Sequence, residues 1–430
     1  MSTSNWPELR IGDLGEVFTG RTPPTERPTY FGVDFPFITP GDMHQGKYAR
    51  ETQRSLSHEG AELLKRIKLP ANGICVSCIG WQMGEVVMTD RQSFSNQQIN
   101  TIVPNDKVDP SFLYYSLRTR KQELLSLGSA TGVRTPILNK SAFCDTKVVI
   151  PPLPVQQRIA GILSAYDELI ENSQRRIKVL ESMARALYRE WFVNFRFPGH
   201  ENHPNVASSL GEIPQGWAVK KLGEIISAHI GGGWGKEAPD EDHIEPAWVI
   251  RGTDIPEARY SQVAGVPYRV HTPSNLSSRK LVAGDIVFEV SGGSKGQPVG
   301  RTLLITSELL ASLGGYVICA SFCKRIQPDV EGYGSELLYL SFLDGYESGE
   351  IEQYQVQSTG ISNFKWTEYI TNTDRVVPSD ALREQFRGHV APLFTQIATL
   401  GLKIKNLRRT RDLLLPRLLS GSVLIEKENL

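Results

Sequence analysis

Two long stretches of the chain carry apolar residues at steps that alternate strictly between four and three positions. The first stretch runs from Ile159 to Trp191, and the second runs from Phe386 to Leu418. Alternating steps of this kind are the heptad pattern of a coiled-coil seam, because the residues form one narrow stripe on an α-helix. The two stripes superpose at a constant offset of 227 residues. They predict two equivalent helices of about 38 residues, each roughly 55–60 Å long.

The narrow stripes favour pairing of the two helices with each other in an antiparallel coiled coil. Packing of each helix on its own globular unit remains the alternative. Arg411 interrupts the second stripe at the position that Ala184 holds in the first, so we expect a carboxylate partner for it. Pro392 lies inside the second stretch and predicts a kink or a restart near His389, because proline removes a helical hydrogen bond.

The rest of the chain is duplicated as well, in two units of about 210 residues. Ile11–Leu14 recurs as Leu222–Ile225, and Phe37-Ile38 recurs as Val249-Ile250. Short helices are predicted at Pro110–Arg120 and Ser335–Asp344, between runs typical of strands. Those runs are Phe35–Thr39, Gly73–Ile79, Val86–Thr89, Ile99–Val103 and Lys147–Ile150, with Ala247–Arg251, Asp285–Val290, Arg301–Ile305, Tyr316–Cys319 and Arg375–Val377 as their counterparts. Each unit is therefore expected to have an α/β or α+β fold, and the chain to be a pseudo-twofold tandem repeat.

Composition adds a constraint on binding partners. The 430 residues include 47 Lys+Arg and 47 Asp+Glu, so the formal net charge is zero. The first 212 residues carry 24 basic and 22 acidic side chains, and the remaining 218 carry 23 and 25. This balance argues against a uniformly basic nucleic-acid binder, although it leaves local basic faces open. The length predicts two or three domains.

Several features indicate a cytoplasmic protein. The amino terminus has no basic segment followed by an apolar stretch, and no run of 18 apolar residues occurs, which excludes a signal peptide and a membrane-spanning helix. Five cysteines, an odd number in a long chain, fit a reducing compartment. Cys75 and Cys78 form a lone C-x-x-C inside a strand-like run, so no metal site is expected there.

The sequence offers no catalytic constellation. Gly231–Lys236 superficially resembles a phosphate-binding loop, but its glycine spacing is one residue short and Glu237 stands where Ser or Thr is required. Asp145-x-Lys147 is a nuclease-like triplet without a convincing upstream acidic partner. We therefore expect no catalytic residue and no metal ligand. A cryptic Mg²⁺-dependent nuclease that uses Asp145 remains as one alternative.

Several short motifs stand at the junctions of the predicted parts. They are Ile150–Ile159 (IPPLPVQQRI), Thr19–Pro24 (TGRTPP), Phe37–Asp42 (FITPGD), Leu210–Trp217 (LGEIPQGW) and Leu414–Gly421 (LLPRLLSG). In this order and duplicated layout, the chain resembles the specificity subunit of Type I restriction–modification systems over nearly its whole length. One departure is Gln156, where that family commonly has Glu; the second copy keeps Glu384.

The resemblance implies a division of labour. Each globular unit is expected to be a target-recognition domain that reads one half of a bipartite site in double-stranded DNA. The helices are expected to act as a spacer and as a dock for two methyltransferase subunits, with restriction/translocase subunits completing the complex. No cofactor is expected in this chain, and S-adenosylmethionine, ATP and Mg²⁺ are implied for the partner subunits. The predicted limits are 1–151 for the first domain, 152–196 for the central spacer, 197–213 for a linker, 214–377 for the second domain, 378–422 for the distal spacer and 423–430 for a tail.

Candidate DNA contacts are side chains on loops that can bond base edges or phosphates. They are Arg21, Thr22, Lys47, Trp81, Gln82, Arg134, Asn139 and Lys140 in the first unit, and Trp234, Lys236, Arg251, Lys295, Gln297, Asn363 and Lys365 in the second. Tyr188, Phe192 and Phe195 exceed what a single seam can bury, so they are candidates for docking a methyltransferase subunit.

One further alternative class is a coiled-coil adaptor whose two globular units bind proteins and lack DNA specificity. If DNA recognition is right, the zero net charge predicts that the isolated chain binds DNA weakly. Partner subunits would then supply much of the phosphate-neutralising affinity.

Overall fold

The computed structural model describes residues 6–44, 46–129, 135–292, 298–329, 331–358 and 360–423. The chain forms two compact units: unit 1 comprises residues 1–170 and 407–430, and unit 2 comprises residues 171–406. The two long helices, α5 (Leu153–Tyr188) and α11 (Asp380–Leu419), each contribute one part to unit 1 and one part to unit 2. The limits of the compact units therefore lie within these helices.

Unit 1 is built on a four-stranded antiparallel sheet in the order β2-β9-β6-β7. A second sheet has the order β3-β5-β4-β8, in which β4 and β8 are parallel, and β1 pairs with β10. The strands are β1 (Glu8–Arg10), β2 (Gly15–Thr19), β3 (Phe31–Gly32), β4 (Phe35–Ile38), β5 (Ser55–Leu56), β6 (Ile74–Ser77), β7 (Val86–Met88), β8 (Phe94–Ser95), β9 (Ile99–Pro104) and β10 (Lys147–Val149). The short helices are α1 (His58–Leu63), α2 (Pro110–Arg118), α3 (Lys121–Ser129) and α4 (Lys140–Asp145).

Unit 2 repeats this plan. The sheet β14-β21-β17-β19 matches β2-β9-β6-β7, the parallel pair β15·β20 matches β4·β8, and β13·β24 matches β1·β10. The strands are β11 (Asn205–Ser208), β12 (Gly211–Pro214), β13 (Ala218–Lys221), β14 (Ile226–Gly231), β15 (Glu245–Ile250), β16 (Tyr268–His271), β17 (Ile286–Glu289), β18 (Ser291–Gly292), β19 (Thr302–Leu304), β20 (Val317–Cys319), β21 (Cys323–Pro328), β22 (Gln355–Ser358), β23 (Ile361–Phe364) and β24 (Asp374–Val377). The helices are α6 (Ile255–Ala258), α7 (Pro273–Arg279), α8 (Ser307–Leu313), α9 (Ser335–Glu347) and α10 (Trp366–Asn372). The shared topology confirms the tandem repeat and the mixed helix–strand class.

One predicted correspondence is wrong. Tyr316–Cys319 contains β20, which pairs in parallel with β15 and so matches β8. The counterpart of β9 is β21, the central strand that separates β14 from β17. Lys324 and Arg325 lie within β21, so its sequence lacks the apolar pattern that predicts a strand. The Arg325 guanidinium can be buried in this strand because its Nε donates to Asp285 Oδ2 at 2.7 Å.

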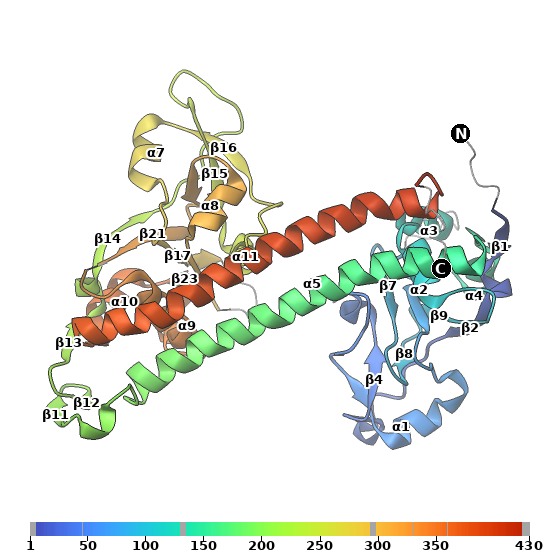
Figure 1. Cartoon of the computed structure of the whole chain (residues 1–430), viewed down its shortest axis with the longest axis horizontal. Coiled ribbons are helices and arrows are strands. Elements are labelled where there is room, and N and C mark those ends of the chain that lie inside the picture. The colour runs from blue at the N-terminus through green and yellow to red at the C-terminus, as the bar shows by residue number, and fades with distance from the viewer. Residues whose placement is uncertain are drawn as a thin grey trace, which may run out of the picture. The chain divides into compact units, whose positions relative to one another are not determined.

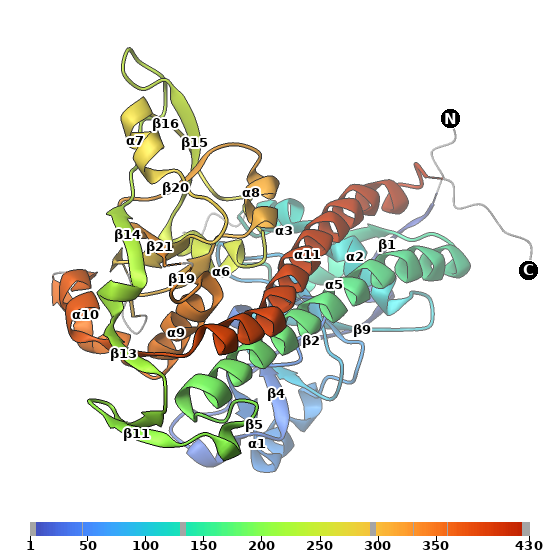
Figure 2. The ribbon, with the colours of Figure 1, turned by 60° about the vertical axis from the view of Figure 1, so that its left-hand side comes forward.

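The predicted seams are buried where the two helices pack side by side (Figure 1, Figure 2). In unit 1, Ile159 and Leu163 of α5 share a core with Leu415 and Leu418 of α11. In unit 2, Ala184 and Trp191 share a core with Phe386 and Val390. Later residues of one helix thus meet earlier residues of the other, which confirms antiparallel pairing.

Two details of the seam were predicted from sequence. Arg411 has a carboxylate partner as expected, because its Nη1 lies 2.5 Å from Asp167 Oδ1 within unit 1. The restart predicted near His389 is not observed, since α11 continues without interruption through Pro392. The carbonyl that proline leaves unpaired belongs to Gly388 at the i−4 position, and residues 387–389 are exposed.

Candidate nucleic-acid interface

Three of the candidate loops in unit 1 meet at one edge of the β2-β9-β6-β7 sheet. β2 and β6 both run antiparallel to β9, so they are parallel to each other and end at the same edge. Thr19 and Val76, near those ends, both pair with Asn100. The segment after β2 carries Arg21 and Thr22, and the segment after β6 carries Trp81 and Gln82.

The third loop is tied to the second by backbone hydrogen bonds. The Leu138 amide donates to the Cys78 carbonyl, and the Gly80 amide donates to the Pro136 carbonyl, each at 2.9 Å. Asn139 and Lys140, both exposed, follow directly. Asn139 Oδ1 accepts a bond from the Ala142 amide at 2.9 Å and caps α4.

Solvent exposure distinguishes the side chains at this edge. Trp81 is 73% exposed, and Gln82 and Arg21 are also exposed. Thr22 Oγ1 donates to Gln97 Oε1 at 2.7 Å. Gln97 is an exposed residue in the turn before β9, and sequence reasoning missed it. The polar run Asn96-Gln97-Gln98 between two apolar strands could have identified Gln97 as a candidate DNA contact.

Lys47 does not belong to this edge. Its Nζ donates to Ser111 Oγ on α2 and to Ser164 Oγ on α5, both at 2.8 Å, and it lies 5.3 Å from the centre of the Tyr115 ring. Burial lowers the pKa of the Lys47 ammonium. These contacts give Lys47 a structural role that attaches the reader to the long helix, in place of the DNA contact expected from sequence.

Unit 2 presents the equivalent sheet edge. β14 and β17 both run antiparallel to β21, and Gly231 and Phe288 both pair with Lys324. Trp234 and Lys236 lie on the segment after β14. Asn363 on β23 joins the same edge because it pairs with Ser291, whose Oγ donates to Asn363 Oδ1 at 2.8 Å.

The cations of this second edge are partly satisfied by neighbouring carboxylates. Lys236 Nζ pairs with Asp240, and Lys365 Nζ lies 3.0 Å from Glu368 Oε2. Trp234 is 41% exposed, and its ring centre lies 4.8 Å from the guanidinium carbon of Arg269. The second edge therefore differs from the first in charge and in hydrogen-bonding groups.

Arg251 is held by its own turn, although its side chain is 40% exposed. Its Nε and Nη2 donate to the two carboxylate oxygens of Asp254 at 2.9 and 2.7 Å, and Nη2 also donates to the Gly265 carbonyl at 2.8 Å. The bonds to Asp254 raise the pKa of the Arg251 guanidinium. Arg251 thus braces the start of α6. Three other candidates, Arg134, Lys295 and Gln297, lie outside the described residues.

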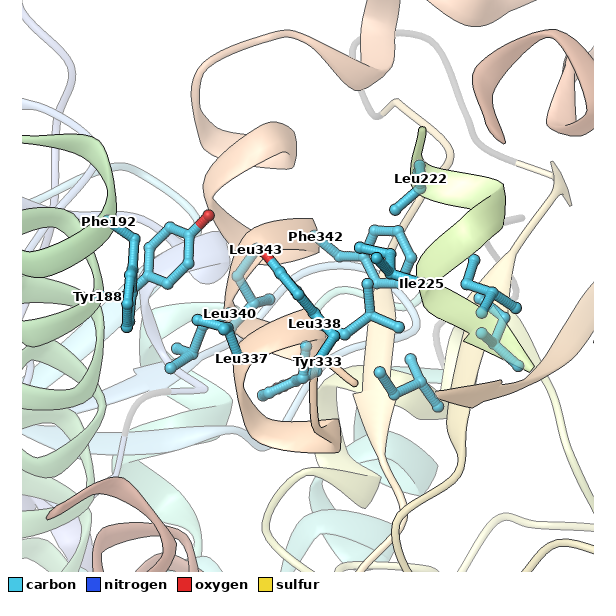
Figure 3. Packing of buried hydrophobic residues seen from close by; sticks show 14 of the residues in the cluster. Tyr188, Phe192, Leu222, Ile225, Tyr333, Leu337, Leu338, Leu340, Phe342 and Leu343 are labelled. Atoms are coloured by element: carbon cyan, nitrogen blue, oxygen red, sulfur yellow. The ribbon is translucent and has the colours of Figure 1, made fainter. Parts of the chain in front are cut away.

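The predicted docking aromatics are core residues. Tyr188 and Phe192 are each 7% exposed, and Figure 3 shows them facing Leu337, Leu340 and Leu343 of α9. Phe195 is half-buried, and its ring centre lies 5.6 Å from that of Trp217. The docking prediction is wrong for Tyr188 and Phe192, because both are buried against the second reader. For the half-buried Phe195 it stays a prediction.

Within the described ranges, no group of three or more His, Cys, Asp or Glu side chains is arranged to hold a metal ion. Asp145, the candidate nuclease residue, lies 3.3 Å from Arg10 Nη1 in an exposed ion pair. The same described residues contain no helix with both the length and the apolar character needed to span a membrane.

Comparison with known proteins gives a consistent result. The family described as Type I restriction modification DNA specificity domain matches residues 3–182. The MjaIX Type I restriction enzyme specificity subunit of Methanocaldococcus jannaschii is 26% identical over 98% of this chain and 94% of its own length. The HindI specificity subunit of Haemophilus influenzae is 34% identical over 39% of this chain and 37% of its own length. The crystal structure of a Type I S subunit from M. genitalium has the same fold, with a TM-score of 0.55, 17% identity and 96% of each chain covered.

Proposed function

We propose that the chain is a DNA specificity subunit of a Type I restriction–modification system, and that its two sheet edges each read one half of a bipartite DNA site. The family match over residues 3–182 and the similarity to the MjaIX subunit along 98% of the chain support this proposal. The observation that carries this proposal is the recurrence of one sheet edge with different side chains. The same topology presents Arg21, Trp81 and Gln82 in unit 1, and Trp234, Lys236 and Asn363 in unit 2. Two copies of one scaffold with unlike loops are suited to reading two unlike half-sites.

The two sheet edges differ in how many side chains can bond base edges and how many can hold phosphates. Arg, Gln and Asn bond base edges in the major groove with two hydrogen bonds, whereas Lys and hydroxyl groups mostly hold phosphates. The unit 1 edge carries the exposed residues Arg21, Gln82, Gln97 and Asn139. This edge is therefore the richer of the two in groups for direct base readout.

The chain acts as the recognition subunit, and methylation and cleavage are assigned to partner subunits. S-adenosylmethionine, ATP and Mg²⁺ belong to those partners. The paired helices α5 and α11 serve as the spacer between readers and as support for two methyltransferase subunits. Restriction/translocase subunits complete the complex on double-stranded DNA.

Charge supports this division of labour. The chain has no net positive charge to attract phosphates, and Lys236 and Lys365 at the unit 2 edge are already paired with carboxylates. Affinity that depends on counterion release scales with the number of phosphates neutralised. We therefore expect weak DNA binding by the isolated chain, and tight, strongly salt-dependent binding when the methyltransferase subunits are present.

The test is a map of methylated adenines in cells that express this chain with its methyltransferase subunit. The expected result is one motif in two parts separated by unspecified bases. Replacing residues 1–150 by the first reader of another specificity subunit should change one part and leave the other unchanged. A continuous motif, or a change in both parts, would contradict two-site reading.

A further inference from the structure

A large cavity in unit 2 lies away from the candidate DNA edge. It measures about 760 Å³ and is bordered by α9, by the loop before β17, by the start of α8 and by the first half of α11. Its apolar floor includes Leu337 of α9 together with Phe386 and Phe394 of α11. α9 is part of the second reader, and α11 is the long helix against which that reader packs. The cavity is here called the acidic groove.

The groove is rimmed by carboxylates that exceed its cations. The acidic side chains that line it are Asp285, Glu308, Glu331, Glu336, Asp380 and Glu384, and the basic ones are Arg383 and Arg387. Asp285 is buried and already pairs with Arg325. Both arginines already face carboxylates, since Arg383 pairs with Asp380 and Arg387 lies 3.7 Å from Glu384. Among the described residues, no cation lies within ion-pairing distance of Glu308 or Glu331.

The corresponding place in unit 1 contains a cation of its own. There the Lys47 ammonium joins Ser111, the second residue of α2, to Ser164 of α5. In unit 2 the second residue of α9 is Glu336, and the residue 227 positions after Ser164 is Ala391; both line the groove. The groove therefore carries an acid where unit 1 has a hydroxyl group.

The residue that corresponds to Lys47 does not fill the groove. Arg259 lies 212 positions after Lys47, and its Nε and Nη2 donate to the Thr302 carbonyl at 3.1 and 2.9 Å. Within the described part of the chain, the cation that pairs with Glu336 is Arg387, at 4.0 Å. In its described residues, unit 2 therefore has no equivalent of the Lys47 ammonium, which in unit 1 bridges the short helix α2 and the long helix α5.

An apolar surface continues from the groove. A second cavity of about 440 Å³ shares Val282 and Ala283 with the first, so the two are neighbours. Val282 is 45% exposed on the shared ridge, and Tyr268 and Tyr316, which line the second cavity, are 52% and 44% exposed. Together the cavities present carboxylates on one side and exposed apolar side chains on the other, where the Lys280 ammonium lies 4.3 Å from the centre of the Tyr316 ring.

We propose that the acidic groove and its apolar ridge bind a basic, amphipathic segment of the methyltransferase subunit. A carboxylate-rimmed surface repels the DNA backbone, so the charge complement is a protein segment rich in Lys or Arg. The apolar side of such a segment covers Val282, and a basic side chain supplies the cation that Lys47 supplies in unit 1. This assignment of the occupant rests on the proposed function, and it replaces the dock expected at Tyr188 and Phe192.

The test compares affinity for the purified methyltransferase subunit between the intact chain and a double variant, Glu308→Lys/Glu331→Lys. We expect the double variant to bind at least about tenfold more weakly, because it places like charges opposite the basic segment. The isosteric pair Glu308→Gln/Glu331→Gln should lose less, and Val282→Ser should weaken binding without changing its salt dependence.

A matched control is available in unit 1. Glu59 is the second residue of α1, as Glu308 is of α8, and Glu51 lies in an exposed loop. The Glu51→Lys/Glu59→Lys variant should keep full affinity, with unfolding temperatures recorded for every variant. Equal affinity of the groove variant and the intact chain would overturn the groove assignment and leave DNA specificity standing. Failure of the intact chain to bind the methyltransferase subunit would contradict the proposed function as well.

Discussion

Arg411 of α11 and Asp167 of α5 form a nearly buried ion pair where the two long helices pack together in unit 1. Arg411 Nη1 lies 2.5 Å from Asp167 Oδ1, and the two side chains are 8% and 12% exposed. The hydroxyl of Tyr115 donates to the other carboxylate oxygen at 2.5 Å. The pair therefore joins α11, α5 and α2 within unit 1. Arg411 also lies 2.8 Å from Asp412 Oδ1 on its own helix, and that carboxylate is 57% exposed.

Replacing Asp167 by Ala should destabilise unit 1 by about 1–3 kcal/mol, because the buried Arg411 would lose one hydrogen-bonded carboxylate and keep only Asp412, which is 57% exposed. The double variant Asp167→Leu/Arg411→Met should lose much less, since an apolar pair of similar size needs no desolvation. Urea unfolding of the full chain, followed by hydrogen exchange of the α2 amides, measures the difference. Equal losses for the single and double variants would show that packing, and not charge, sets the cost.

Gly401 lets the second reader approach α11 closely. A Cβ atom at this position would overlap the carbonyl of Tyr260. Gly401→Ala should therefore destabilise unit 2 by about 1–3 kcal/mol, the usual cost of an overpacked contact. Gly388 lies on the same helix, and a Cβ atom added there would meet nothing within 4 Å, so Gly388→Ala should stabilise by up to about 1 kcal/mol. Thermal unfolding of the two variants should give shifts of opposite sign.

Four of the five cysteines are buried, and Cys144 is partly exposed. Burial raises the pKa of Cys75 and Cys319 to about 12 and that of Cys78 to about 11, and it holds the pKa of Cys323 well above its ordinary value. At pH 8 we expect one thiol per native chain, Cys144, to react rapidly with a disulfide reagent. The other four should react after denaturation.

The same thiols predict how stability depends on pH. Their pKa values are higher in the folded than in the unfolded chain, so burial of the protonated thiols contributes fully below pH 9, the ordinary thiol value. This contribution declines as the pH rises toward 11–12, because the unfolded chain then binds fewer protons. A Cys75→Ala variant should lose part of the alkaline decline in unfolding temperature.

Trp81 and Gln82 should affect recognition without affecting stability. Trp81 is 73% exposed, so Trp81→Ala/Gln82→Ala should leave the unfolding temperature unchanged. Loss of base contacts should reduce methylation about 10- to 100-fold, or relax the half-site that unit 1 reads, at about 1–3 kcal/mol per lost base contact. Val33 is 92% exposed in the same unit, and Val33→Ala is the control that should retain the full methylation pattern.

The parts of the fold that sequence predicts are those with local periodicity. The seam from Ile159 to Trp191 repeats every three or four residues, so it identifies a helix face without knowledge of its partner. The partner of Arg411 followed from the same register. By contrast, β21 escaped detection because Arg325 breaks its apolar pattern, and its compensating partner, Asp285, lies 40 residues away.

Side-chain roles at the site needed contacts that are distant in the chain. Lys47 and Trp81 both stand on polar loops, but Ser164 engages Lys47 from 117 residues away. Arg251 carried a local clue, since Asp254 follows three residues later as a capping partner. Tyr188 and Phe192 resembled a free aromatic face because α9, which covers them, lies about 150 residues further along. Long-range burial, rather than residue type, separates these structural roles from binding roles.

The division of both long helices between the units sets an order of completion during synthesis. The core of unit 1 includes Leu415 and Leu418, which leave the ribosome after all of unit 2. At roughly 5–20 residues per second, the amino-terminal reader waits tens of seconds for its last core residues. The core of the amino-terminal unit is thus completed after that of unit 2, and a chain that stops before Leu415 lacks residues that belong to the amino-terminal core.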